Sequence, residues 1–256
     1  INDENITDST PLESIEVIRS RLKIKNNNIL TNLNSLKNLK EINGLSLDNL
    51  PELKSIDAFF YANKLFTLHL KNLPKLSELN DFENVTKLGN IVIENCNSLK
   101  MITSFKKAEE IEGHFILSFN ENLSDISGFS NIKIIHGKLF TRNNENLNNL
   151  NGFKNLVTVK EDVSIQLVKG LKHLEFVGGN LNLFDADYSI EKLEGLNSLK
   201  VVNGLFYLKG FHSLKNLDEL NNLEKVGNFG IEDCSSLENI DLESLGVLPR
   251  LAKSPC

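Results

Sequence analysis

The sequence predicts an all-β protein, a parallel β-solenoid of about ten stacked coils with a cap at each end. Two residue types dominate its 256 residues, with 43 Leu and 36 Asn, and such a bias usually reflects an internal repeat. Aligning the chain with itself gives units of 23 or 24 residues. Each unit opens with apolar residues spaced by two, as in a strand buried on one face. A unit this short cannot bury its own apolar side, so the units are expected to stack.

The first inward residue of each predicted strand marks the start of a coil. These residues are Leu22, Leu45, Leu68, Ile91, Phe115, Leu139, Val163, Leu181, Leu205 and Phe229. The steps between them are 23, 23, 23, 24, 24, 24, 18, 24 and 24 residues. A second inward residue follows two positions later, and only Thr141 interrupts that apolar column.

Another apolar column lies fourteen residues after the start of the coil. It holds Phe in five consecutive coils, at Phe59, Phe82, Phe105, Phe129 and Phe153. Parallel stacking places equivalent residues about 4.8 Å apart, so we expect these rings to form an interior stack. An aromatic binding groove would use the same residues, but their positions follow the inward period, which favours a structural spine.

A polar column lies four residues after the start of the coil, where the strand ends. It comprises Asn26, Asn49, Asn72, Asn95, Asn143, Asp185 and Asp233. Corners leave backbone N–H and C=O groups without partners in the sheet, and stacked Asn side chains can supply the missing bonds. Part of the Asn excess is therefore explained without a ligand.

The repeat predicts one continuous domain over residues 22–240. The coil at residues 163–180 is six residues short, so we expect a notch or a kink near Gln166–Lys169. A domain boundary there is the alternative, but the register resumes at once at Leu181. Residues 1–21 are predicted to form a polar tail and a cap, and residues 241–256 a second cap and tail, because uncovered solenoid ends expose strand edges.

Three segments share one sequence pattern. In each of them a Leu or Ile is followed by an Ile or Val, then by a Gly, and then by a predicted strand. They are Leu36–Leu47, Leu199–Leu205 and Ile132–Leu139. This order resembles the repeat of receptor L domains, the leucine-rich solenoids of insulin- and EGF-type receptor ectodomains and of fungal cell-wall proteins. The resemblance spans roughly residues 22–240 and implies a right-handed solenoid that acts as an extracellular, non-catalytic binding module. One departure is that receptor L domains have disulfide-linked ends, whereas this chain has three Cys. The Asn column is also similar to that of ordinary leucine-rich repeats, including those of bacterial surface proteins.

Composition and motifs argue against several classes of function. A net charge of −6 and a pI near 5.5 are unlike a surface that binds nucleic-acid phosphates. No apolar run approaches the roughly 20 residues that span a bilayer. The five His share no metal-ligand spacing, and neither a phosphate-binding loop nor a nucleophile elbow occurs. We therefore expect no metal, no cofactor, no nucleic-acid partner and no membrane span.

Carboxylates and thiols likewise give no sign of catalysis. The outward acids of the predicted strands, Asp48, Glu94 and Glu232, are separated by two and six coils, whereas glycosidase pairs lie about 5–9.5 Å apart. Cys96 and Cys234 lie six coils apart, roughly 29 Å at the spacing of parallel strands, which is too far for a disulfide. We expect free thiols and a non-enzymatic protein, with a polysaccharide-processing β-helix as the enzymatic alternative.

Two apolar groups are predicted on the outward face of the strands. They are Val92, Ile116 and Phe140 in one group, and Phe184, Phe206 and Leu208 in the other. Contiguous exposed apolar area marks binding or self-association surfaces, unless a loop or a terminal segment covers it. We therefore expect a cell-surface or secreted binding or adhesion module that recognises a protein or a glycan. A structural cell-wall or matrix protein is the alternative. Neither a leader nor an anchor is visible in this sequence.

Overall fold

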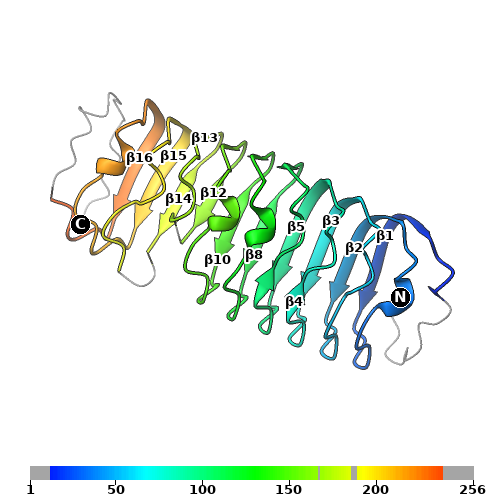
Figure 1. The fold of residues 1–256 in the computed structure, drawn as a ribbon. Helices are drawn as coiled ribbons and strands as arrows, with labels where there is room; N and C mark the ends of the chain where they lie inside the picture. The colour runs from blue at the N-terminus through cyan, green and yellow to red at the C-terminus, as the bar shows by residue number, and fades with distance from the viewer. Residues whose placement is uncertain (1–11, 167, 186–188, 239–256) are drawn as a thin grey trace.

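The structure, a computed structural model, describes residues 12–166, 168–185 and 189–238. Within them the chain is all-β apart from short 3₁₀ segments, and it winds into a parallel β-solenoid. Figure 1 shows the coils side by side in one elongated stack, from β1 (Val17–Lys25) at one end to β16 (Lys225–Glu232) at the other. The predicted all-β solenoid is confirmed.

One strand of each coil lies in a long parallel sheet, and these ten strands span about nine turns. They are β1, β2 (Glu41–Asp48), β3 (Lys64–Lys71), β5 (Lys87–Glu94), β8 (Phe115–Ser118), β10 (Leu139–Arg142), β12 (Val163–Ile165), β14 (Leu181–Phe184), β15 (Val201–Lys209) and β16. Equivalent residues pair from strand to strand: Leu45 with Leu68, and Leu68 with Ile91. The predicted coil starts stack in this way from Leu22 to Leu181.

In the middle coils the long strand divides into two short ones. The second row of strands comprises β7 (Glu110–Ile111), β9 (Ile134–Ile135), β11 (Thr158–Val159) and β13 (Phe176–Val177). In β3 the inward Leu65 and Leu68 are three residues apart, whereas Ile111 and Phe115 are separated by four. The extra residue of the 24-residue coils is thus accommodated here, where it interrupts the strand. Elsewhere, β4 (Glu78–Leu79) and β6 (Met101–Ile102) form a small separate sheet.

The coil of β15 departs from the predicted register. Leu181 pairs with Phe206 rather than with Leu205, and the pairing of β15 with β16 shifts between Val202 and Leu205. The last two steps are therefore 25 and 23 residues, not 24 and 24. Because successive residues of a strand face opposite sides, a slip of one residue exchanges the two faces.

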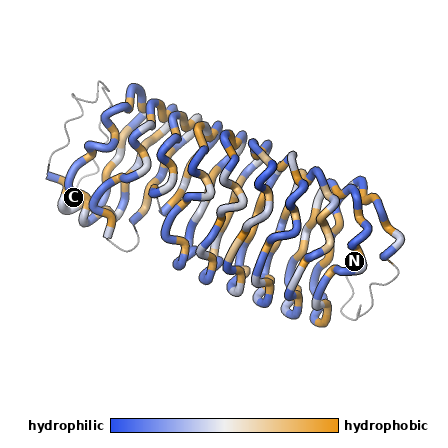
Figure 2. The backbone as a smooth tube through the Cα atoms, in the orientation of Figure 1, coloured by the Kyte–Doolittle hydropathy of each residue, from blue (hydrophilic) through white to orange (hydrophobic). Residues whose placement is uncertain are grey.

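The predicted phenylalanine spine is confirmed. Its five rings are fully buried, with successive ring centroids 5.3–5.8 Å apart and ring planes within 24° of each other. Two of the rings belong to the 3₁₀ turns η3 (Ser127–Phe129) and η4 (Asn151–Phe153). A Cβ on Gly128 would lie 2.0 Å from the carbonyl oxygen of Ser104, so neighbouring coils approach closely beside the spine. Figure 2 shows hydrophobic and hydrophilic stretches alternating along each coil.

The predicted corner column depends on backbone conformation as well as on side-chain bonds. Its five Asn residues have φ between 53° and 57°, the left-handed region that Asn tolerates better than most residues. Asn49 Nδ2 donates to Asn26 Oδ1 at 3.0 Å, and Asn95 Nδ2 donates to Asn72 Oδ1 at 3.1 Å. Asparagine therefore both turns the chain and bonds adjacent corners together.

The predicted N-terminal tail (residues 1–11) and C-terminal cap (241–256) lie outside the described residues. The segment after the tail already includes the start of β1, in which Ile18 pairs with Ile42. The short coil at residues 163–180 stays in the stack, because β12 pairs with both β10 and β14. Over the described residues, no helix has the length and apolar character to cross a bilayer.

Candidate functional site

The exposed face of the long sheet carries the first predicted apolar group. Val92 on β5 pairs with Ile116 on β8, and Ile116 pairs with Phe140 on β10. All three side chains are partly buried, whereas the residues that precede them, Ile91, Phe115 and Leu139, are in the core. The structure therefore brings this group together on one face.

The second predicted group lies only in part on that face. Phe184, at the end of β14, is partly exposed, but Phe206 and Leu208 are fully buried. The prediction was wrong for these two residues because β15 contains an extra residue between Val202 and Leu205. In the segment Leu205–Leu208 the residues facing either side of the strand are apolar or aromatic. The sequence pattern is therefore compatible with both registers. Tyr207 takes the outward place, and its ring meets that of Phe184 edge to face, with centroids 6.3 Å apart.

Arg142, at the end of β10, connects the two groups. Its Cζ lies 3.8 Å from the ring centroid of Phe184 and 5.3 Å from that of Phe140, within the range of cation–π attraction. Arg142 Nη2 donates to Ser164 Oγ at 2.7 Å. Its Nε is buried and has no acceptor in the described chain. Burial lowers the pKa of Arg142, but the guanidinium stays protonated at neutral pH.

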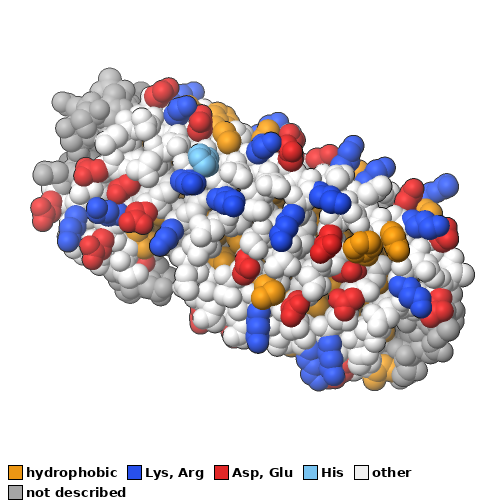
Figure 3. Space-filling model, in the orientation of Figure 1, with side chains coloured by type: hydrophobic (Ala, Val, Ile, Leu, Met, Phe, Trp, Pro, Cys, Tyr) orange, Lys and Arg blue, Asp and Glu red, His pale blue; other side chains and the backbone are white. Residues whose placement is uncertain are grey.

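Arg142 is an exception in a column of paired charges. Three lysines of this outward column have carboxylate partners on the next strand: Lys25 with Asp48 at 2.8 Å, Lys71 with Glu94 at 3.4 Å, and Lys209 with Glu232. Beside Arg142 the column holds Ser118 and Gln166 instead. Among the described residues, no carboxylate lies within ion-pair distance of Arg142. Figure 3 shows side chains of both signs interspersed along one side of the molecule.

Phe119 is a second exception beside the same face. It occupies the corner column, where most other coils have Asn, with a φ of 56°. A bulky residue rarely adopts this conformation, which costs of the order of 1–3 kcal/mol. Phe119 is 52% exposed, and its backbone N–H donates to the carbonyl oxygen of Arg142 at 3.2 Å. An exposed phenylalanine in a strained conformation is therefore hydrogen-bonded to the backbone of Arg142.

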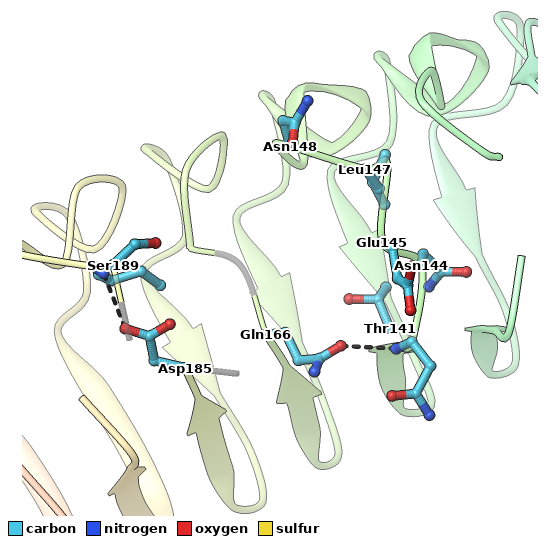
Figure 4. A pocket seen from close by; sticks show the side chains of 10 residues that line it. Thr141, Asn144, Glu145, Leu147, Asn148, Gln166, Asp185 and Ser189 are labelled. Carbon is cyan, nitrogen blue, oxygen red and sulfur yellow. Dashed lines mark hydrogen bonds between the residues drawn. The ribbon is translucent and has the colours of Figure 1, made fainter. Parts of the chain in front are cut away.

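A hollow of about 490 Å³ lies beside the short coil, where the missing residues predicted a notch. Its polar lining includes Thr141, Asn144, Glu145, Gln166, Asp185 and Ser189, and Figure 4 shows these side chains coming from successive coils. Thr141, the residue that interrupts the inward column, is 3% exposed. Gln166 Oε1 accepts a bond from the backbone of Asn143 at 2.7 Å, and Asp185 Oδ2 accepts one from Ile190 at 2.9 Å.

The outward acids and the thiols have structural surroundings. Asp48, Glu94 and Glu232 each pair with a lysine. Cys96 and Cys234 are free, as predicted, and burial raises the pKa of the Cys96 thiol to about 12. The third cysteine, Cys256, lies outside the described residues. Within the described ranges, no group of three or more His, Cys, Asp or Glu side chains could hold a metal ion.

Sequence reasoning missed Arg142, Phe119 and Tyr207. Two of them had a visible signal, since Arg142 is a cation without an acidic neighbour in its column and Phe119 replaces Asn in the corner column. Tyr207 was hidden by the register slip in β15.

Comparison of the chain with protein-family models, with curated proteins and with solved structures finds no match.

Proposed function

We propose that this chain is a non-catalytic binding module that recognises a protein partner through the exposed face of its long sheet. The observation that carries the proposal is the set Val92, Ile116, Phe140, Arg142 and Phe184, here termed the sheet-face patch. Its members lie on strands β5, β8, β10 and β14, and Arg142 contacts both Phe140 and Phe184. Contiguous apolar area on an exposed face is typical of interaction surfaces, and aromatic and Arg side chains are enriched at binding hot spots.

The solenoid supports binding by holding the sheet-face patch rigid. Each strand under the patch is hydrogen-bonded to a neighbour on either side, and the residues beneath it are fully buried. Side chains anchored in this way lose little conformational freedom when a partner docks, which lowers the entropic cost of association. A regular sheet face also suits a partner that offers an extended segment or another flat surface.

A cell-surface or secreted location is part of the proposal. It is supported by the resemblance of segments such as Leu36–Leu47 to the receptor L-domain repeat. A structural role in a wall or matrix would place no demand on Arg142, whose guanidinium has no carboxylate partner among the described residues, unlike the lysines of its column. The sheet-face patch therefore favours recognition over a purely structural role.

A glycan is the second candidate ligand, favoured by the hollow beside the short coil. The hydroxyl, amide and carboxylate groups of Thr141, Gln166 and Glu145 line it, and such groups bond sugar hydroxyls. The hollow is separate from the apolar part of the sheet-face patch, so the two candidates use different residues and can be told apart by mutation.

The test compares two double variants of the intact chain on a panel of purified cell-surface ectodomains and on a glycan array. Ile116→Asn/Phe140→Asn changes the sheet-face patch, whereas Phe60→Asn/Tyr61→Asn removes exposed aromatic rings from a loop. We expect at least tenfold weaker binding of an identified ectodomain by the first variant and unchanged binding by the second. Binding that survives the first variant, or binding to glycans alone, would overturn the proposal of a protein ligand.

A further inference from the structure

The guanidinium of Arg142 is fixed in place yet incompletely satisfied. The ring of Phe184 lies against it at 3.8 Å, and Ser164 accepts one bond from Nη2. Nε is enclosed without an acceptor, whereas Nη1 is neither enclosed nor bonded within the described chain. An incoming group therefore meets the terminal nitrogens, whose positive charge is only partly compensated by protein atoms. A positive charge in such partly desolvated surroundings attracts an anion more strongly than one in water does.

We propose that Arg142 binds one carboxylate of an extended, acidic peptide segment of the protein partner. This inference rests on the function proposed above and names the chemistry of its central contact. Lysines elsewhere in the same outward column pair with carboxylates of this chain, as Lys71 does with Glu94 and Lys209 with Glu232. At Arg142 the corresponding carboxylate is absent from the described chain, and the partner would supply it.

The surroundings of Arg142 favour a single carboxylate. The flanking residues of its column, Ser118 and Gln166, are neutral, so one positive charge faces the ligand. That charge balances one carboxylate, and the planar fork of a guanidinium matches the geometry of that group.

The same surroundings favour a peptide over an acidic sugar. Val92 and Ile116 continue the face away from Arg142 through directly paired positions, and both side chains are aliphatic. They offer sugar hydroxyls no hydrogen-bond partner, but they fit apolar side chains next to an Asp or Glu. In an extended peptide, residues two apart lie on one side, so an acidic residue and an apolar residue at that spacing would reach Arg142 and Phe140 or Ile116 together.

The probe is a displayed library of random twelve-residue peptides, selected on the intact chain. The strongest binder is synthesised in its acidic form and with the acidic residue changed to the corresponding amide, and dissociation constants are measured by calorimetry. We expect Arg142→Gln and the amide peptide each to weaken binding about tenfold, and the two changes together to add little, as for a directly interacting pair. Lys71→Gln removes the same charge from a paired site on the same face and should change the constant by less than twofold.

A spectroscopic measurement separates contact from loss of structure. The chain contains four arginines, so labelling arginine with ¹⁵N leaves few Nε–H resonances to assign. Addition of the acidic peptide should shift the resonance of Arg142 and leave those of Arg19 and Arg21 in place. Arg142→Lys should keep the melting temperature and bind less tightly, because it retains the charge without the planar fork.

The outcomes distinguish this inference from the function on which it rests. Selected peptides that lose binding with Phe140→Asn but not with Arg142→Gln would overturn the carboxylate anchor and leave the binding face intact. Peptides insensitive to both changes would overturn both proposals. Arg142-dependent binding of uronic-acid oligosaccharides without any acidic peptide would replace the peptide with a glycan.

Discussion

At the scale of single residues, asparagine serves three structural purposes in this solenoid. At the corners it adopts positive φ, as described above. In the interior, Asn120 and Asn144 are buried and donate to backbone carbonyls, with Asn144 Nδ2 2.9 Å from the oxygen of Leu117. On the opposite side of the coil, five others donate to a carbonyl of the preceding coil at 2.6–2.9 Å: Asn38, Asn84, Asn131, Asn155 and Asn222. The first purpose shapes the corner of each coil, and the other two satisfy backbone groups that the sheets leave unpaired, so the Asn excess is a consequence of stacking.

Phe119 provides a test of the corner conformation. Phe119→Asn and Phe119→Ala both remove the ring, but only Asn suits a φ of 56°. We expect the Asn variant to be more stable than the Ala variant by about 1 kcal/mol, which corresponds to roughly 2–4 °C in melting temperature for a chain of this size. Thermal unfolding followed by circular dichroism measures the difference. Equal melting temperatures would mean that the left-handed conformation is not a source of strain here.

At the scale of elements, the sequence predicts those strands whose two faces differ in polarity. In β3 the inward Leu68 and Leu70 alternate with His69 and Lys71, so burial of one face selects a single register. In β15 apolar residues occupy both alternations, and the register depends on a bulge that only pairing with β14 and β16 reveals. The contact between Arg142 and Phe184 was equally hidden, since it joins coils separated by an intervening one and 42 residues of sequence. Periodicity therefore predicts the stack and its core, whereas the site depends on local departures from periodicity.

The spine links five successive coils through contacts between buried rings. Phe129 contacts Phe105 and Phe153 in the spine and meets Phe115 edge to face, with centroids 4.9 Å apart. Phe129→Ala should lower the free energy of unfolding by about 3–5 kcal/mol, because it removes a fully buried ring and leaves a cavity between two others. Phe60→Ala, at a residue that is 48% exposed, should cost less than about 1 kcal/mol.

Urea unfolding with linear extrapolation measures both changes. A loss of less than 1 kcal/mol for Phe129→Ala would show that the neighbouring rings collapse into the space, and the spine would then contribute little as a continuous stack.

At the scale of the whole molecule, each coil contacts mainly its immediate neighbours. The long strands pair only with the preceding and following coils, from β1 on β2 to β15 on β16. The free energy of unfolding of such a chain is approximately a sum of contributions from each coil and from each interface between adjacent coils. Coils at an end have one interface fewer than those in the middle. Accordingly Ile231, Cys234 and Leu237 at the C-terminal end of the described stack are only partly buried, whereas the spine residues are fully so.

This nearest-neighbour organisation predicts which coils are destabilised by a substitution at a given place in the solenoid. Phe229→Ala, in the last described strand, should speed amide hydrogen exchange in β16 and β15 and leave β3 and β5 unchanged, because the end can open without the rest. Phe129→Ala should instead increase exchange first in β8 and β10, next to the missing ring, and then in coils on both sides. Hydrogen-exchange mass spectrometry of the two variants at equal temperature resolves the difference. If both variants increased exchange uniformly from β1 to β16, the chain would unfold as one cooperative unit, and the separation into independent coil terms would be wrong.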